Sequence, residues 1–263
     1  MHEIGMTAAE LRVIYGKNIL DLSDVELDRV QTIAVKYGLA VISVASPLLK
    51  CELPGAPPID SRIPHDVFGK KHAFADQPRL TERTFLVARK MGARIIRVFS
   101  YWRTVAPEQC FDRVVVALRG LADEAAQHDL VIGLENEHAC NIATAAEAAD
   151  VLRAVDHPHF KLIWDPANAF VAGEKAYPDG YRLLPVDRIV HVHAKDCTVR
   201  DHQPVWAPLG EGDVNWKGQI QALKKDGYRG YISLETHWRG PNGDKYRASE
   251  ICGRNLKALV TAA

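Results

Sequence analysis

The chain alternates short apolar runs with longer stretches in which apolar residues recur every three or four positions. Short apolar runs occupy residues 9–14, 39–45, 93–100, 130–135, 160–165, 188–194 and 231–235. Stretches with helical spacing occupy residues 23–38, 79–91, 111–128, 144–155, 216–226 and 245–260. The first pattern predicts β-strands and the second predicts amphipathic helices, so the chain reads as repeated strand–helix units.

Residues at the expected helix ends support this assignment. Ser23 with Glu26, and Thr144 with Glu147, have the spacing of a capping box at the start of a helix. Gly92 directly follows the stretch 79–91, and glycine commonly ends a helix. Local capping signals and hydrophobic spacing therefore agree on where the helices begin and end.

The expected strands are almost continuously apolar, which is typical of a parallel sheet covered by helices on its faces. Doubly wound sheets and (β/α) barrels both fit this pattern. Four of the strands (130–135, 160–165, 188–194 and 231–235) carry acidic or histidine residues at or near their ends. In a barrel these ends converge on one mouth, so the sequence favours a single α/β domain over 1–263, a (β/α)8 TIM barrel. The chain has no G-x-G-x-x-G fingerprint of a dinucleotide-binding fold.

About seven strand–helix units can be counted, whereas a complete barrel has eight. The shortfall lies at the N-terminus, so we expect the first βα unit to be missing from the chain. A truncated reading frame or a partner chain that covers the gap would account for it. The long segment 46–78 is expected to be either a lid or an oligomer contact, and in the second case the protein would be a homo-oligomer.

Composition narrows the class of protein. Of 263 residues, 47% are apolar and 25% are charged, and 33 basic residues balance 33 acidic ones. Zero net charge argues against a nucleic-acid partner. No signal peptide and no apolar run of about 18 residues is present, so we expect a cytoplasmic protein without a membrane partner. The five cysteines show no C-x-x-C spacing and are expected to be free thiols.

Four residues near the strand ends form the candidate metal site: Glu135, Asp165, His193 and Glu235. A carboxylate at the end of a buried strand is unfavourable unless it is paired, hydrogen-bonded or bound to a metal. Any one of them could instead cap a helix or pair with an arginine, but four at one mouth predict a metal. Three carboxylates with one imidazole suit one divalent ion, Mn²⁺ first, with Mg²⁺, Co²⁺ or Zn²⁺ as alternatives. His191 shares the strand face of His193 and could be a supporting or a core residue.

Five segments of the chain resemble those of a known family: LENEHACN, WDPANAF, HVHAKD, PLGEGDVNW and GYRGYISLETHW. Over residues 10–260 they resemble the sugar phosphate isomerase/epimerase superfamily, which has a xylose isomerase-like barrel. That superfamily includes D-tagatose 3-epimerase, hydroxypyruvate isomerase, inosose dehydratase and 3-dehydroshikimate dehydratase. The resemblance implies that Glu135, Asp165, His193 and Glu235 bind the metal. It also implies that Glu135 and Glu235 exchange the substrate proton from opposite faces.

The sequence also departs from the epimerases of that superfamily. Asn168 stands where they often have a histidine, and Asn141 and Val199 stand where they carry a substrate-binding Glu and Arg. The chain is therefore not a close copy of the ketose 3-epimerases. Lys195, in the pattern H-x-K-D, suits members that act on keto-inositols, dehydroshikimate or related oxo-sugars, and we expect it to be catalytic.

Further residues near the expected mouth are candidates for substrate contact: Lys50, Arg103, His138 and Asn168. Lys50 and Arg103 each follow a strand, and His138 lies three residues beyond Glu135. The alternative for Arg103 is a salt bridge within a loop.

These residues predict a divalent-metal-dependent isomerase or epimerase of a small sugar or polyhydroxy-carbonyl compound, acting through an enediolate. The alternative is a metal-dependent dehydratase of an inosose, an oxo-sugar or a dehydroshikimate-like substrate. A DNA-repair enzyme like endonuclease IV is a remote third possibility, because the chain has few histidines at strand ends and no basic excess. A non-catalytic binding module is disfavoured because all four candidate ligands are present.

Overall fold

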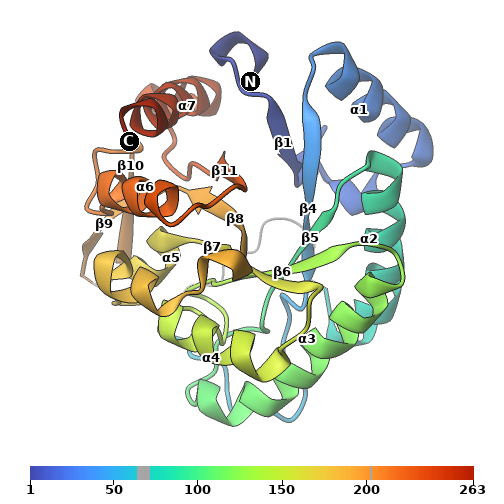
Figure 1. The fold of residues 1–263 in the computed structure, drawn as a ribbon. Coiled ribbons are helices and arrows are strands. Elements are labelled where there is room, and N and C mark those ends of the chain that lie inside the picture. The colour runs from blue at the N-terminus through green and yellow to red at the C-terminus, as the bar shows by residue number, and fades with distance from the viewer. Residues whose placement is uncertain (64–71, 202) are drawn as a thin grey trace.

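Seven parallel strands form one curved sheet at the centre of the molecule (Figure 1). The computed structural model describes residues 1–63, 72–201 and 203–263. In the order of the sheet the strands are β1 (Ala8–Leu11), β4 (Ala40–Leu48), β5 (Ile95–Val98), β6 (Val131–Glu135), β7 (Phe160–Trp164), β8 (Ile189–Ala194) and β11 (Tyr231–Leu234). All six neighbouring pairs are parallel, as the continuous apolar runs predict.

The helices lie outside this curved sheet, as Figure 1 shows. They are α1 (Asp24–Lys36), α2 (Gln77–Met91), α3 (Phe111–Ala126), α4 (Ala145–Val155), α5 (Pro166–Val171), α6 (Trp216–Lys225) and α7 (Lys245–Ala262). Both expected capping boxes are formed, at the starts of α1 and α4, and α2 ends at Gly92 with φ 70°. Among the described residues no helix is both long and apolar enough to cross a membrane.

Apolar side chains fill the space between the sheet and its helices. Leu118 of α3, Val151 of α4 and Leu162 of β7 are completely buried there. Along β8, Val192 belongs to this apolar layer, whereas His191 and His193 lie at alternate positions and share the other face. The sheet therefore separates an apolar outer layer from an interior that contains the two histidines.

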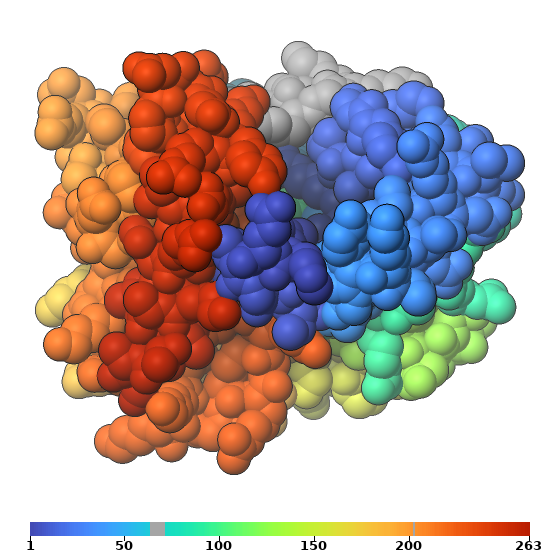
Figure 2. All heavy atoms as spheres, turned by 90° about the horizontal axis from the view of Figure 1, so that it is seen from above, coloured from blue at the N-terminus to red at the C-terminus, as the bar shows by residue number. Residues whose placement is uncertain are grey.

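The two end strands of the sheet, β1 and β11, are not paired with each other, so the barrel is nearly closed and has one open edge. The side chains of β11 are only partly buried, and Tyr231 is 47% exposed. A cavity of about 820 Å³ lies along this edge, with Ile4, Met6, Ile232 and Leu256 in its wall. Figure 2 shows the N-terminal segment between the C-terminal helix and the elements that follow β1. The expected barrel is confirmed, with seven strands in the described residues where a complete barrel has eight.

The first expected strand, 9–14, is shorter than predicted. Strand β1 ends at Leu11, and the chain then forms a small hairpin of β2 (Val13–Ile14) and β3 (Lys17–Asn18). Its turn residues, Tyr15 and Gly16, have φ values of 54° and 74°. Two left-handed residues make a tight hairpin turn that ends the apolar alternation.

Other differences concern loops near the mouth. The segment 46–78 is shorter as a loop than expected, because β4 continues to Leu48 and α2 begins at Gln77. Residues 64–71 of this segment, the expected lid or oligomer contact, lie outside the described residues. The sequence patterns missed the six-residue helix α5 and a hairpin of β9 (Asp196–Arg200) with β10 (Gln203–Ala207). Helix α5 and the two strands of the hairpin are each only five or six residues long, which is too short to produce a clear period.

Candidate metal centre

The fold brings the four expected metal ligands together at the carboxyl ends of four strands. Glu135 is the last residue of β6, Asp165 follows β7, His193 lies in β8 and Glu235 follows β11. One donor atom from each can be chosen so that all four atoms lie within 4.8 Å of one another. Residues separated by up to 100 positions meet because parallel barrel strands end at one mouth.

Backbone and amide contacts hold the ligands in place. The side chain of Asn136 donates to the carbonyl oxygen of Asp165 at 2.9 Å and accepts from its backbone N–H at 2.8 Å, which joins the ends of β6 and β7. Oδ1 of Asp165 accepts a hydrogen bond from the backbone N–H of Asn168 and so caps α5. The backbone N–H of Glu235 donates to the carbonyl oxygen of Ala194, which fixes the end of β11 against β8.

Two buried cations lie among these carboxylates. Nζ of Lys195 lies 2.7 Å from Oδ2 of Asp165 and 2.9 Å from Oε2 of Glu235. Nη1 of Arg97 lies 3.2 Å from Oε2 of Glu135 and 3.6 Å from Oε1 of Glu235. Lys195 and Arg97 are 2% and 4% exposed, so each needs the neighbouring carboxylates to offset the loss of hydration.

These charges shift the pKa values of the site. Burial raises the pKa of Asp165 to about 6, against the opposing effect of Lys195. Burial would also raise the pKa of Glu235, but the charges of Lys195 and His193 hold it well below its usual value. For His193 burial would lower the pKa, whereas the charge of Glu10 raises it well above its usual value. Each buried charge therefore has an opposite neighbour.

The donor atoms and their unmet hydrogen bonds fit a divalent cation. Within the described residues, Nδ1 of His193 is buried and makes no hydrogen bond, while Oε2 of Glu135 and Oδ2 of Asp165 are buried with ion-pair contacts only, to Arg97 and Lys195. A buried polar atom without a hydrogen bond is uncommon, because it is unfavourable by about 1–3 kcal/mol. Ligands of this kind lie roughly 2.0–2.2 Å from a bound ion. Donors within 4.8 Å of one another can close on one ion with small movements.

Three of the expected substrate-binding residues form a connected chain beside the cluster. Nδ2 of Asn168 lies 3.2 Å from Oε1 of Glu135, and Oδ1 of Asn168 lies 3.1 Å from Nδ1 of His138. The same nitrogen of His138 is 3.0 Å from Oε1 of Glu137, whose other oxygen lies 3.5 Å from Nζ of Lys50. Burial would lower the pKa of His138, but the charge of Glu137 raises it. A protonated His138 is a hydrogen-bond donor next to the ligands.

Arg103 is not brought into this chain of contacts. Its guanidinium group lies 2.9 Å from Oε1 of Glu147 and donates to the carbonyl oxygens of Cys140 and Asn141. Glu147 is the capping-box residue of α4. Arg103 therefore ties the loop after β6 to α4, which is the loop salt bridge that the sequence left open as an alternative.

Two charged residues of the site, Arg97 and Glu10, were not singled out by the sequence patterns. Each is a charged residue inside a short, otherwise largely apolar strand, and this was the only signal available. Oε2 of Glu10 lies 2.8 Å from Nε2 of His193, across the interior from β1 to β8. His191 lies beside them, and its Nε2 is 2.8 Å from Oγ of Ser233. The face that these residues share becomes visible only when the strands are placed next to one another.

Comparison with known proteins agrees with the barrel fold. The family model described as "Xylose isomerase-like TIM barrel" matches residues 1–252. A curated relative, an inosose dehydratase of Lactiplantibacillus plantarum, is 22% identical over 197 residues, which cover 68% of this chain and 62% of that protein. The alignments with the curated relatives span between 44% and 62% of their lengths, so the chain matches less than two thirds of each.

Solved structures resemble nearly the whole chain. The probable 3-DHS dehydratase AsbF of Bacillus anthracis has a TM-score of 0.74 and 22% identity, over 98% of this chain and 90% of that one. The IOLI protein with a binding zinc atom has a TM-score of 0.74 and 16% identity, over 99% and 90% of the two chains. At these identities the likeness establishes the fold.

Proposed function

Since this chain belongs to the xylose isomerase-like TIM barrel family, we propose that it is a divalent-metal-dependent enzyme that acts on a small polyhydroxy-carbonyl compound. The observation that carries this proposal is the convergence of Glu135, Asp165, His193 and Glu235 around one point, with the ammonium group of Lys195 beside them. Three carboxylates and one imidazole favour Mn²⁺, with Mg²⁺, Co²⁺ or Zn²⁺ as alternatives.

The chemistry that such a site favours begins at a C–H bond next to a carbonyl group. A divalent cation held by these ligands would supply positive charge that stabilises the negative oxygen formed when the C–H bond loses its proton. A carboxylate within reach of the proton acts as the general base, a contribution of about 10²–10⁴-fold in rate. The positions of the neighbouring side chains then determine which atom receives the proton and which bond the electron pair forms.

We assign the base to Glu235. Both carboxylates contact cations, but the side chain of Glu235 is 18% exposed, whereas that of Glu135 is 1% exposed and also accepts a hydrogen bond from Asn168. Glu235 takes the proton, and the electron pair of the C–H bond forms the enediolate. Protonation of Glu235 removes one of the charges that raise the pKa of Lys195 well above its usual value.

Lys195 can then donate a proton to a β-hydroxyl group of the substrate. The C–O bond breaks, water leaves, and the electron pair of the enediolate forms the new C=C bond. Lys195 regains its proton from Glu235, whose Oε2 lies 2.9 Å from Nζ. The net reaction is the dehydration of a hydroxy-carbonyl compound to an enone and water, with both residues restored.

We therefore place dehydration of an inosose, an oxo-sugar or a dehydroshikimate-like compound first. The unequal surroundings of Glu135 and Glu235 support one base rather than two, and the dehydratase relatives support the same order. An isomerase or epimerase is the second candidate. It is favoured by the presence of both carboxylates in one cluster, since Glu135 could return a proton to the face of the substrate opposite Glu235. Lys50, His138 and Asn168 are proposed to bind the substrate hydroxyl groups.

The test is a reaction screen on inososes, oxo-sugars and 3-dehydroshikimate in deuterated water, with Mn²⁺, Mg²⁺, Co²⁺ or Zn²⁺ added in turn. New ultraviolet absorbance from an enone, lost in Glu235→Gln and retained in the exposed control Glu211→Gln, supports the dehydratase. Deuterium incorporation without loss of water supports the epimerase. If neither occurs with any of the four divalent ions, and the dialysed protein holds no metal, the proposed function is wrong.

A further inference from the structure

The carboxylate of Glu10 lies against the ring nitrogen of His193 that points away from the metal cluster. Oε2 of Glu10 is 2.8 Å from Nε2 of His193. The other ring nitrogen, Nδ1, lies 3.3 Å from Oε1 of Glu135 and 3.8 Å from Oε2 of Glu235. The imidazole thus has Glu10 on one side and the expected ligands on the other.

Glu10 is itself held in a fixed orientation. The hydroxyl group of Ser43, a completely buried residue of β4, donates to Oε1 of Glu10 at 2.8 Å. The two oxygens of the carboxylate therefore have separate partners, one on β4 and one on β8. A side chain fixed at both oxygens can fix the imidazole in turn.

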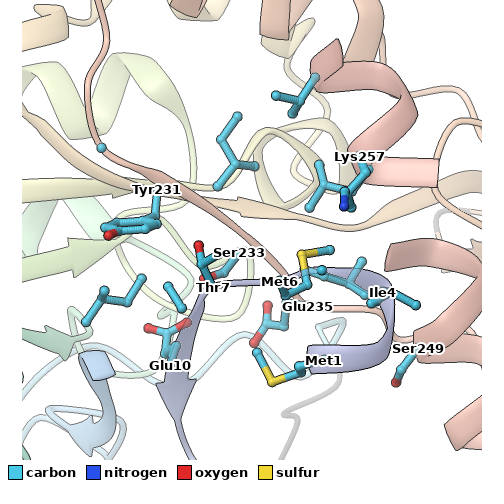
Figure 3. Close-up of a pocket in the computed structure, with 18 of the residues that line it drawn as sticks. Met1, Ile4, Met6, Thr7, Glu10, Tyr231, Ser233, Glu235, Ser249 and Lys257 are labelled. Atoms are coloured by element: carbon cyan, nitrogen blue, oxygen red, sulfur yellow. The ribbon is translucent and has the colours of Figure 1, made fainter. Parts of the chain in front are cut away.

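The contact also crosses the open edge of the barrel. Strands β1 and β8 are not neighbours in the sheet, and β1 and β11 are not paired. Figure 3 shows Glu10 on β1 and Glu235 beyond β11 in the wall of the same cavity. In the part of the chain that the structure describes, no backbone ladder joins β1 to β11, so the contact of Glu10 with His193 links the two sides of the open edge through side chains.

We propose that Glu10 is a positioning residue of the metal centre, an inference that rests on the proposed metal-dependent function. Glu10 accepts a hydrogen bond from the Nε2–H group of His193. This selects the tautomer in which the lone pair of Nδ1 points at Glu135, Asp165 and Glu235. A metal-binding histidine whose second nitrogen donates to a carboxylate is better oriented and more basic than a free one.

The same atoms could instead belong to a second metal site. Donor atoms of Glu10, His191 and His193 also lie within 4.8 Å of one another and could hold a separate ion. In that case Nε2 of His193 would bind metal and could not donate to Glu10. Nε2 of His191 lies 3.9 Å from Oε2 of Glu10 and 2.8 Å from Oγ of Ser233, which favours Ser233 as its partner.

The experiment compares Mn²⁺ affinity in the full chain, Glu10→Gln and Glu10→Ala, by competition with a chelator. We expect about 10–100-fold weaker binding, with Ala at least as weak as Gln, since outer partners of metal ligands have effects of this size. The control Glu3→Gln makes the same chemical change in the same N-terminal segment and should bind as the parent does. With Zn²⁺ as a diamagnetic probe, ¹⁵N spectra should show a hydrogen-bonded Nε2–H group of His193 in the parent, and the chemical shift of this group should change in Glu10→Ala.

The outcomes separate this inference from the proposed function. A parent chain that binds no divalent ion contradicts the proposed function. A parent that binds one ion, with Glu10 variants of equal affinity and an unchanged ¹⁵N spectrum, overturns only the role of Glu10. Two ions per chain would make Glu10 a ligand and also overturn it. If both Glu10 variants fail to fold, Ser43→Ala, which frees Oε1 without touching His193, should show a smaller loss of affinity, and no loss would overturn the inference.

Discussion

Nζ of Lys195 lies 2.7 Å from Oδ2 of Asp165, so a buried ammonium group is already paired with a carboxylate that we propose as a metal ligand. The same nitrogen lies 2.9 Å from Oε2 of Glu235. A metal bound as we propose would share two carboxylates with the lysine, so the stability of the chain should depend on both cations. This relationship can be tested without knowledge of the substrate.

Lys195→Met should make folding more dependent on metal. Removing one partner of a buried ion pair typically costs about 3–5 kcal/mol, because the carboxylates are left uncompensated. A bound divalent ion would offset part of this loss, so the rise in Tm on adding Mn²⁺ should be larger in Lys195→Met than in the parent. Thermal unfolding with Mn²⁺ and with EDTA measures this metal-induced rise in Tm. Lys217→Met, an exposed change on α6, is the control, and equal metal-induced shifts in all three proteins would contradict the prediction.

Gly133→Ala should destabilise the barrel at the strand that carries Glu135. A Cβ atom at Gly133 would lie 2.7 Å from Cγ1 of Ile163 and 3.3 Å from Cγ2 of Ile95. Overpacking of this kind costs about 1–3 kcal/mol. Gly120→Ala is the matched control on α3, where a Cβ atom meets nothing within 4 Å. That change should stabilise the helix by about 0.5–1 kcal/mol. In urea unfolding, the free energy of unfolding should fall in Gly133→Ala and rise in Gly120→Ala. A rise in both variants would contradict the prediction and show that the barrel interior can accommodate the added methyl group.

Glu26 should support the fold only while it is ionised. Its hydrogen bonds with Lys17 and with the backbone of Ser23 lower its pKa from 4.5 to about 2. Because the folded-state pKa is lower, the contribution is complete above pH 4.5 and is lost as the pH falls towards 2. The parent should therefore have a higher Tm than Glu26→Gln at neutral pH, and the difference should shrink in acid. A difference that grows as the pH falls would contradict this assignment.

Backbone amides of β11 should exchange with solvent faster than those of β7. Strand β7 is paired on both sides, whereas β11 is paired only with β8 and its side chains are partly exposed. Strands with an unpaired edge and little buried surface open locally at low free energy. Hydrogen exchange followed by mass spectrometry compares peptides from the two strands. Equal protection of both strands would mean that the open edge is closed in solution.

The sequence predicted much of the fold because its signals are local. The capping pairs Ser23 with Glu26 and Thr144 with Glu147 formed as expected, since each depends on four consecutive residues. The convergence of the expected ligands followed from the rule that parallel strands end at one mouth. The sequence also predicted the number of strands in the barrel, because each strand is a separate short apolar run.

The sequence by itself thus determined the seven strands, six of the seven α-helices and the four ligand candidates near the strand ends. Only the tertiary structure decided that Arg97 and Glu10 belong to the same site and that Arg103 pairs with Glu147 on α4. The physical reason is that a charged residue inside a strand gains its partner from strands distant in sequence. Hydrophobic spacing records which side of an element is buried, but it does not record what lies opposite that side.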